Sequence, residues 1–232
     1  RDSRVLGGGE VSHTVEGTLF GLAVENEIGL QTRTDAIRVG LFNTTARQTR
    51  STVLDDRVLE ASAALYVESR MRWTDWLRTS VGVRADGFSA DVRSDTPANS
   101  GTARDGIVNP KLGVVLGPWF DTEVFVNYGG GFHSNDARGV TATVDPASPL
   151  FNISRSPFLV PSTGSEIGLR NRSLAGLETA VSLFQLDFAS ENLFQGDTGT
   201  TEPSRPTRRF GVEWTNRYAV TPWLSLEGDL TI

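Results

Sequence analysis

The chain has 232 residues, a formal net charge of −6 and no cysteine, and 38% of its residues are hydrophobic. The absence of cysteine excludes disulfide frameworks, thiolate metal sites and cysteine nucleophiles. The negative charge argues against nucleic-acid binding, which requires a basic surface. No apolar run approaches the roughly 18 residues that a transmembrane helix needs. A soluble protein is the simplest interpretation, but a transmembrane β-barrel stays open because its strands alternate and need not be hydrophobic overall.

Alternation of apolar and polar residues with period two predicts about ten β-strands and no helix. The pattern is clearest from Leu59 to Trp73, where apolar residues at odd positions alternate with polar residues such as Glu68 and Arg70 at even positions. A strand of about fifteen residues is much longer than a typical soluble strand. The expected strands cover residues 10–20, 25–41, 57–73, 77–92, 107–117, 123–133, 163–171, 177–188, 209–219 and 224–232.

Two local features interrupt this alternation. Its phase becomes ambiguous between Phe184 and Phe188, which predicts a β-bulge. The run Gly129-Gly130-Gly131 lacks the lysine and the following helix of a phosphate-binding loop. Three glycines in a strand instead favour a bend or a close backbone approach near a barrel rim.

The connections between the expected strands alternate in length. Short turns lie at 74–76, 118–121, 172–176 and 221–222, whereas long polar connections lie near 43–56, 93–106, 134–161 and 190–208. Short turns at one rim and long loops at the other are typical of outer-membrane barrels, in which the short turns are periplasmic.

Tryptophan placement favours the same architecture. Trp73, Trp76, Trp119 and Trp223 lie at or beside short turns. Tryptophan prefers the membrane–water interface, where the ring is apolar and its N–H stays hydrated. The alternative interpretation is that these tryptophans cover one end of the hydrophobic core of a soluble protein.

The two faces of the strands differ in charge. One carries Glu60, Glu68, Arg70, Arg72, Arg78, Arg84 and Asp86, which implies a wet or plugged lumen if this face points inward. A β-sandwich with its polar face outward would show the same alternation, but strand length, loop asymmetry and the tryptophans favour the barrel. An arginine at Val81 should cost about 2–4 kcal/mol if that position lies at the bilayer midplane. The side chains expected to face lipid are Leu65, Val67, Val81, Val83, Leu112, Val114, Val124 and Val126, and those expected to face the lumen are Glu68, Arg70, Arg84 and Asn127.

His133, Ser134 and Asp136 are the residue types of a catalytic triad. Neighbours on an extended chain point to opposite faces, whereas triads are assembled from distant positions, so we expect no catalytic residues and no enzyme. His13 is the only other histidine, which argues against a histidine metal site. No cofactor is expected.

The polar segment 200–209 contains Arg205, Arg208 and Arg209. Guanidinium groups pair bidentately with anions, so these residues suit an anionic siderophore or a lipopolysaccharide phosphate. The alternative is a solvated loop whose charges serve solubility.

Four segments together resemble TonB-dependent outer-membrane receptors. They are Asn109–Gly113 (NPKLG), Asn127–Gly139 (NYGGGFHSNDARG), Ser165–Arg170 (SEIGLR) and Phe210–Glu213 (FGVE). The resemblance covers roughly residues 25–232. It implies a barrel of about 22 strands with an N-terminal plug, located in the Gram-negative outer membrane. Such receptors import ferric siderophores, cobalamin or similar scarce nutrients with energy delivered through TonB.

Residues 1–232 are therefore expected to be all-β, an antiparallel meander forming part of a large transmembrane β-barrel, and a fragment without plug, TonB box or terminal strands. The expected partners are outer-membrane lipid and lipopolysaccharide, the TonB complex through the missing plug, and a small ligand such as a metal chelate. A passive porin and a soluble β-sandwich binding module are the alternatives. The loops 134–160 and 194–208 should lie on the extracellular rim. The residues expected to contact ligand are Phe132, His133, Asn135, Asp136, Arg138, Arg205 and Arg208.

Overall fold

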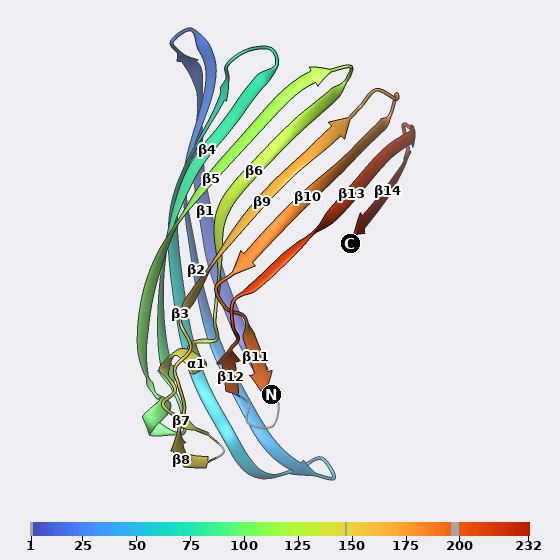
Figure 1. Cartoon of the computed structure of the whole chain (residues 1–232). Helices are drawn as coiled ribbons and strands as arrows, with labels where there is room; N and C mark the ends of the chain where they lie inside the picture. Colours follow the sequence, from blue (N-terminus) through green and yellow to red (C-terminus); the bar gives the residue numbers. More distant parts are fainter. Residues whose placement is uncertain (1, 147, 196–199) are drawn as a thin grey trace.

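The computed structural model describes residues 2–146, 148–195 and 200–232. They form a ten-stranded antiparallel sheet in which successive strands of the chain are neighbours, so the predicted meander is confirmed. The sheet curls into a trough (Figure 1). Its strands are β1 (Asp2–Leu19), β2 (Leu22–Thr45), β3 (Gln48–Arg72), β4 (Leu77–Arg93), β5 (Gly101–Trp119), β6 (Thr122–Ser134), β9 (Leu159–Asn171), β10 (Leu177–Phe188), β13 (Thr207–Thr221) and β14 (Leu224–Thr231).

Short elements occupy the two longest connections. Between β6 and β9 lie the helix α1 (Ala137–Thr141) and a small sheet of β7 (Val144–Asp145) with β8 (Ser148–Asn152). Between β10 and β13, β11 (Asn192–Gln195) pairs with β12 (Thr200–Pro203). The expectation of no helix is therefore wrong for α1, whose N-cap Asp136 accepts a hydrogen bond from the Arg138 backbone. Among the described residues, no helix is long and apolar enough to cross a membrane.

Two of the predicted long connections are wrong. Instead of a loop over 43–56, β2 and β3 continue to a turn at Ala46 and Arg47, whose φ angles are 49° and 64°. Positive φ is costly for residues with a Cβ, and hairpin turns that need it usually have the sequence Asn-Gly or Asp-Gly. This turn is Ala-Arg, so the sequence does not indicate a hairpin here. The connection near 93–106 shrinks to residues 94–100, with a 3-10 turn η1 (Pro97–Asn99).

The predicted bulge between Phe184 and Phe188 is also wrong, because β10 stays in unbroken register with β9 and β13 there. The phase was ambiguous because Phe184 lies on the polar face, over Gly211 of the next strand. A Cβ at Gly211 would come within 2.9 Å of that ring. Tyr66 covers Gly29 in the same way, and a Cβ at Gly29 would lie 2.3 Å from the Tyr66 ring. Glycine here makes room for an aromatic ring directly across the ladder.

The triple glycine allows the close approach expected of it. A Cβ at Gly130 would lie 3.0 Å from the Asn109 side chain and 3.2 Å from Pro110. The pairing of β6 with β5 extends to Gly129, while its pairing with β9 continues to Ser134. The strand thus leaves β5 at the glycines.

The two ends of the sheet differ as predicted. The hairpin turns after β1, β3, β5, β9 and β13 share the upper end in Figure 1, whereas the β2–β3 hairpin, η1 and α1 lie at the opposite end. At the short-turn rim, Trp76 stacks on Trp119 with a centroid separation of 6.3 Å. The Trp73 indole donates a 2.8 Å hydrogen bond to Thr79.

The outer face carries a long region without charge. Starting at the short turns, outward positions of β3 run from Trp73 to Leu59 and those of β4 from Leu77 to Ser89 without an ionisable residue. Charge returns with Arg57 and Asp91. Four of the expected lipid-facing residues, Leu65, Val67, Val81 and Val83, lie in this region, and Val81 is 54% exposed. On β5 and β6, the expected residues Leu112 and Val126 are exposed, whereas Val114 and Val124 are only partly exposed. Large exposed apolar surface of this kind needs an apolar environment.

We predict that Val83→Arg destabilises the protein in a bilayer by about 2–4 kcal/mol, because Val83 faces outward opposite Val67, near the middle of the uncharged region. The measurement is the urea unfolding midpoint of the protein reconstituted in phospholipid vesicles. The matched control is Asn127→Arg, which places the same charge on the inner face beside Glu166. Equal midpoints for the two variants would contradict the facing of the strands.

Candidate functional site

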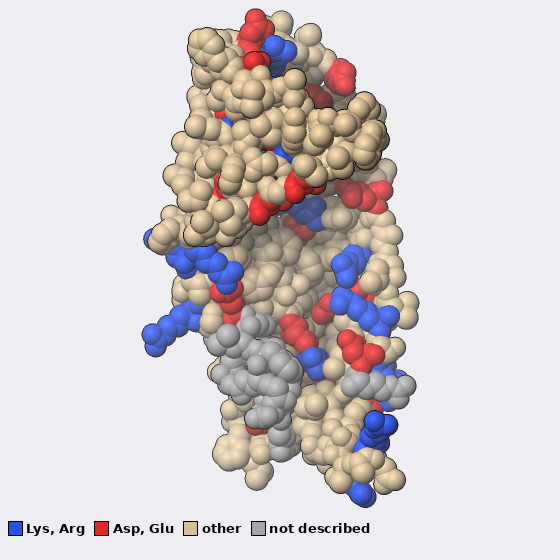
Figure 2. All heavy atoms as spheres, turned by 90° about the vertical axis from the view of Figure 1, so that its right-hand side faces the viewer, with Lys and Arg blue, Asp and Glu red and all other residues tan. Residues whose placement is uncertain are grey.

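The inner face of the trough encloses an open cavity of about 1040 Å³. Figure 2 looks into this hollow and shows Lys, Arg, Asp and Glu side chains gathered along it. Charged or amide side chains from each of the strands β1 to β6 line it, so the inward facing predicted for Glu68, Arg84 and Asn127 agrees with the structure. The charged and amide side chains of the lining include Glu10, Glu27, Glu68, Arg84, Lys111 and Asn127.

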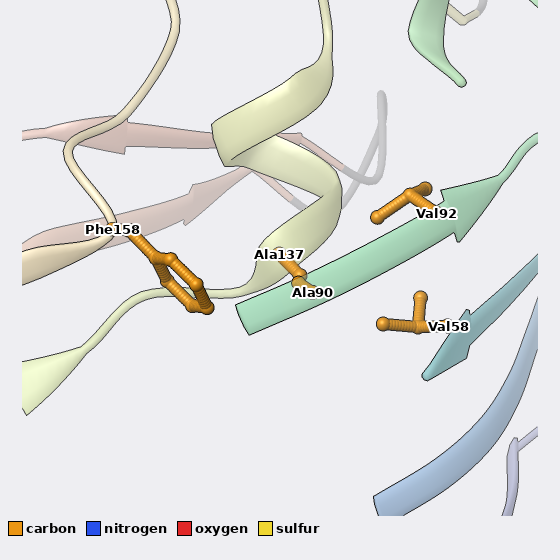
Figure 3. Packing of buried hydrophobic residues seen from close by; sticks show 5 residues of the cluster. All are labelled: Val58, Ala90, Val92, Ala137 and Phe158. Carbon is orange, nitrogen blue, oxygen red and sulfur yellow. The ribbon is translucent and has the colours of Figure 1, made fainter. Parts of the chain in front are cut away.

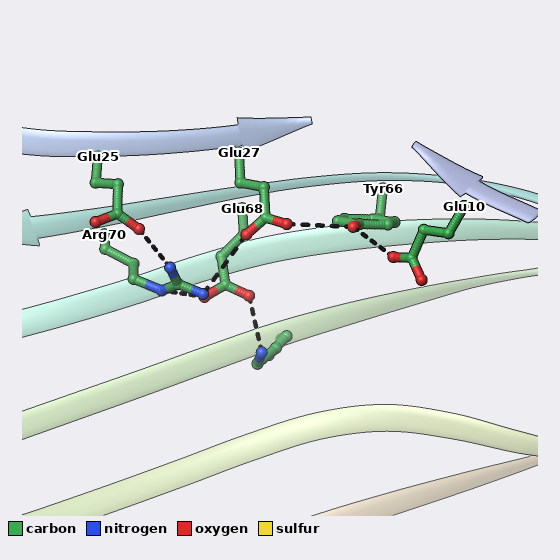
Figure 4. Close-up of polar contacts among 7 residues, drawn as sticks. Glu10, Glu25, Glu27, Tyr66, Glu68 and Arg70 are labelled. Atoms are coloured by element: carbon green, nitrogen blue, oxygen red, sulfur yellow. Dashed lines mark hydrogen bonds and ion pairs between the residues drawn. The ribbon is translucent and has the colours of Figure 1, made fainter. Parts of the chain in front are cut away.

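The middle of the hollow is an acidic network (Figure 4). The Tyr66 hydroxyl from β3 donates to Glu10 on β1 and lies 3.2 Å from Glu27 on β2. Arg70 donates a 2.7 Å hydrogen bond to Glu68, whose other oxygen accepts from Lys111 at 2.8 Å.

With Glu25 also bound to Arg70, the network holds four carboxylates against two cations. Contacts such as Glu68–Lys111 skip a strand, which side chains can do only where they converge on the inside of a curved sheet. The middle of the hollow therefore has a net negative charge.

A basic cluster lies nearer the tryptophan rim. Glu123 is 6% exposed and is surrounded by Arg78, Arg170 and Arg172. Arg172 also pairs with Glu178 at 2.8 Å. Three guanidinium groups against two carboxylates make this end of the inner face net positive, so the charge on the wall changes sign along the strands.

The connection between β6 and β9 folds inward against the wall. Ala137 of α1 is fully buried, and with Phe158 it covers Val58 on β3 and Val92 on β4 (Figure 3). This cluster includes Ala90 and is the buried apolar core of the described chain. Burying these side chains fixes the connection over the inner face, where it narrows the hollow at the end opposite the tryptophans.

Asn99 fastens this connection to the β4–β5 turn. Its side-chain oxygen accepts from the backbone amides of Thr143 and Val144, and its amide donates to the Val144 carbonyl at 2.9 Å. The Asn99 carbonyl accepts from the Thr141 hydroxyl. Asn99 is 4% exposed, so these bonds are shielded from water.

The structure divides the seven expected ligand contacts among different surroundings. Phe132 lies at the cavity, edge-on to Phe88 with 5.6 Å between ring centroids. His133 is half-buried on β6. Of the seven, Phe132 is the one that borders the main cavity.

Three of the seven hold the loop together. Asn135 is 4% exposed, and its amide donates to the Pro157 carbonyl at 2.7 Å. Asp136 caps α1 and forms a two-pronged ion pair with Arg138. Burial lowers the pKa of Arg138, but the hydrogen bond and charge of Asp136 outweigh burial, so its pKa lies above the ordinary value.

Arg205 lies on the connection between β10 and β13, and Arg208 lies at the start of β13. Arg205 is exposed, whereas Arg208 pairs with Asp187 across the strands. Glu191 in the same connection accepts from the Thr207 hydroxyl at 2.8 Å and pairs with Arg209. The Thr207 bond and then the Arg209 charge lower the pKa of Glu191.

Sequence reasoning missed the acidic network as a candidate site. Glu10, Glu25 and Glu27 gave a usable signal, because they share the inward parity of β1 and β2 with the charged face of β3. Among the described residues, no group of three or more histidine or acidic side chains is arranged to hold a metal ion.

Comparison with known proteins identifies relatives of this architecture. A family model described as TonB dependent receptor-like, beta-barrel matches residues 2–231. No curated protein matches the sequence significantly. Among solved structures, the alcaligin receptor FauA from Bordetella pertussis matches with a TM-score of 0.71 and 14% identity, over 99% of this chain and 38% of its own.

Two further structures match equally broadly. The ferric preacinetobactin receptor BauA from Acinetobacter baumannii matches with a TM-score of 0.72 and 11% identity, over 99% of this chain and 36% of its own. The ferric citrate transporter FecA matches with a TM-score of 0.69 and 15% identity, over 99% of this chain and 35% of its own. Such identities show a shared fold, and the chain spans little more than a third of each protein.

We predict that Asn99→Ala releases the β6–β9 connection from the wall, because it removes three side-chain hydrogen bonds, each contributing about 0.5–1.5 kcal/mol. Limited proteolysis of the protein in its membrane should cut residues 142–156 at least about fivefold faster. Asn43→Ala, which removes an exposed bond to Ser51, is the matched control and should not change the rate. Equal cleavage of both variants would show that Asn99 does not hold the connection.

Proposed function

Because the chain belongs to the TonB-dependent receptor β-barrel family, whose members reside in the Gram-negative outer membrane, we propose that it forms part of the wall of a receptor that takes up a scarce nutrient, such as a ferric siderophore, with energy delivered through TonB. TonB would act through a plug domain seated in the hollow. The nutrient would be recognised by residues of the hollow and by the loops at its outer end.

The observation that carries this proposal is the cavity of about 1040 Å³ on the inner face, whose lining includes charged side chains from several strands. Its volume is at the upper end of the range for small-molecule sites, about 300–1,000 Å³. The outer face meanwhile has the uncharged region that a bilayer requires. The solved structures with this fold include receptors whose names specify ferric chelates, which supports the same class of cargo.

The direct test is uptake of radiolabelled iron by cells that express the whole receptor, with ferric citrate, a ferric catecholate and a ferric hydroxamate as probes. We expect uptake of at least one chelate to exceed that of receptor-deficient cells by about tenfold and to stop when a protonophore collapses the proton-motive force. Uptake that continues unchanged under the protonophore would point to a passive pore. No uptake of any probe would remove ferric chelates from the proposal.

We also expect two loop replacements to weaken binding of the transported chelate by about tenfold or more. In one, a short Gly-Ser linker replaces residues 137–156; in the other, it replaces residues 192–206. Loops tolerate such changes because they lie outside the strand ladder, so heat-modifiable mobility in gels should show normal barrel assembly. Titration of the purified receptor with the chelate gives the affinity.

The control shortens the β2–β3 hairpin by residues 43–50, a change of the same kind at the same rim, and it should preserve affinity. If binding and uptake were unchanged in both loop replacements, recognition would belong to the plug and other loops.

A further inference from the structure

A row of three arginines crosses the outer face of the sheet. Arg38 on β2 is directly opposite Arg57 on β3, which is directly opposite Arg93 on β4. Strands lie about 4.8 Å apart, so the three residues fall within about 10 Å. All three are exposed.

Their outward direction follows from their neighbours. Val58 and Val92 are buried under α1 on the inner face, and Ile37 packs against the same cluster. Successive side chains of a strand point to opposite faces, so Arg57, Arg93 and Arg38 point away from the hollow. They cannot contact cargo inside it.

The row lies at the far edge of the uncharged region. Sixteen residues (73 − 57) separate Arg57 from Trp73 along the strand. At about 3.3 Å per residue and a tilt of about 40°, this corresponds to about 40 Å along the membrane normal. That is the thickness of a bilayer with its headgroups. With tryptophans at one interface, the row lies among headgroups of the opposite leaflet.

Like charges directly opposite one another destabilise a sheet, so the row needs a source of negative charge. Two carboxylates supply part of this negative charge. Asp55 pairs with Arg38, and Asp91 pairs with Arg93 at 3.4 Å. Arg57 stands exposed between the two pairs. Three cations against two carboxylates leave the patch net positive, and exposed Arg104 on β5 lies nearby, opposite Ser89.

We propose that Arg38, Arg57 and Arg93 bind a phosphate group of the phosphorylated glycolipid in the outer leaflet of the outer membrane, with Arg57 as the central contact. Guanidinium groups bind phosphate through paired N–H donors. The site faces the outer leaflet at the depth where the glycolipid phosphates lie. The proposal depends on the outer-membrane location and not on which nutrient is taken up.

The test is titration of the whole receptor, purified in detergent, with bisphosphorylated lipid A. Arg57→Gln should weaken binding about tenfold, as expected for loss of a charge-assisted contact, and Arg57→Lys should restore most of it. Arg50→Gln, an exposed arginine near the hairpin tip, is the matched control and should have no effect. Heat-modifiable mobility checks that each variant is folded.

Two further arms use the unaltered receptor. Lipid A without phosphates should bind about tenfold more weakly, and inorganic phosphate at the same concentration should not displace the glycolipid. Wild-type affinity in folded Arg57→Gln, or equal affinity for dephosphorylated lipid A, would overturn the proposal. Displacement by inorganic phosphate would show a site for the free ion and would also overturn it.

Discussion

The structure depends on one constraint, which is that a backbone amide or carbonyl in hydrocarbon must have a hydrogen-bond partner. The chain meets it by pairing each strand of the main sheet with its sequence neighbours over long, mostly unbroken registers, as in the 18 pairs from Asp2–Val39 to Leu19–Leu22. The turns and loops of the described chain lie at the two ends of the sheet, where backbone groups can reach water. The long strands, the meander order and the position of the loops all follow from this requirement.

The same ladder divides the side chains into two environments. Val83 faces outward while its neighbour Arg84 pairs with Asp86 on the inside. Charge is tolerated inward because the hollow is open to solvent, and ion pairs such as Arg70–Glu68 hold the charged side chains in place. Outward, charge returns only beyond Leu59, where the bilayer ends. A single alternation therefore encodes both membrane insertion and a polar interior.

Much of this architecture was predictable from sequence, because period-two alternation, tryptophans beside short turns and loop asymmetry each report on the same geometry. The β2–β3 hairpin was not, since Ala46 and Arg47 adopt left-handed backbone conformations that neither residue favours. The candidate site was harder still. Asn135, Asp136 and Arg138 are polar loop residues by sequence, but Asn135 binds Pro157 more than twenty positions away and Asp136 caps α1 and pairs with Arg138, so all three support the loop. Nothing local to Asn99 reveals that it will bind residues more than forty positions away.

The central claim is that alternate residues of one strand face lipid and water. The chain contains no cysteine, so single cysteines can be placed at each position from 79 to 86 of β4 in the receptor in native membranes. We predict that cysteines at 80, 82, 84 and 86 react with a small water-soluble thiol reagent, whereas an environment-sensitive fluorophore at 79, 81, 83 and 85 is quenched by lipid-bound quenchers. Uniform reactivity along the strand, or quenching at the even positions, would contradict the account.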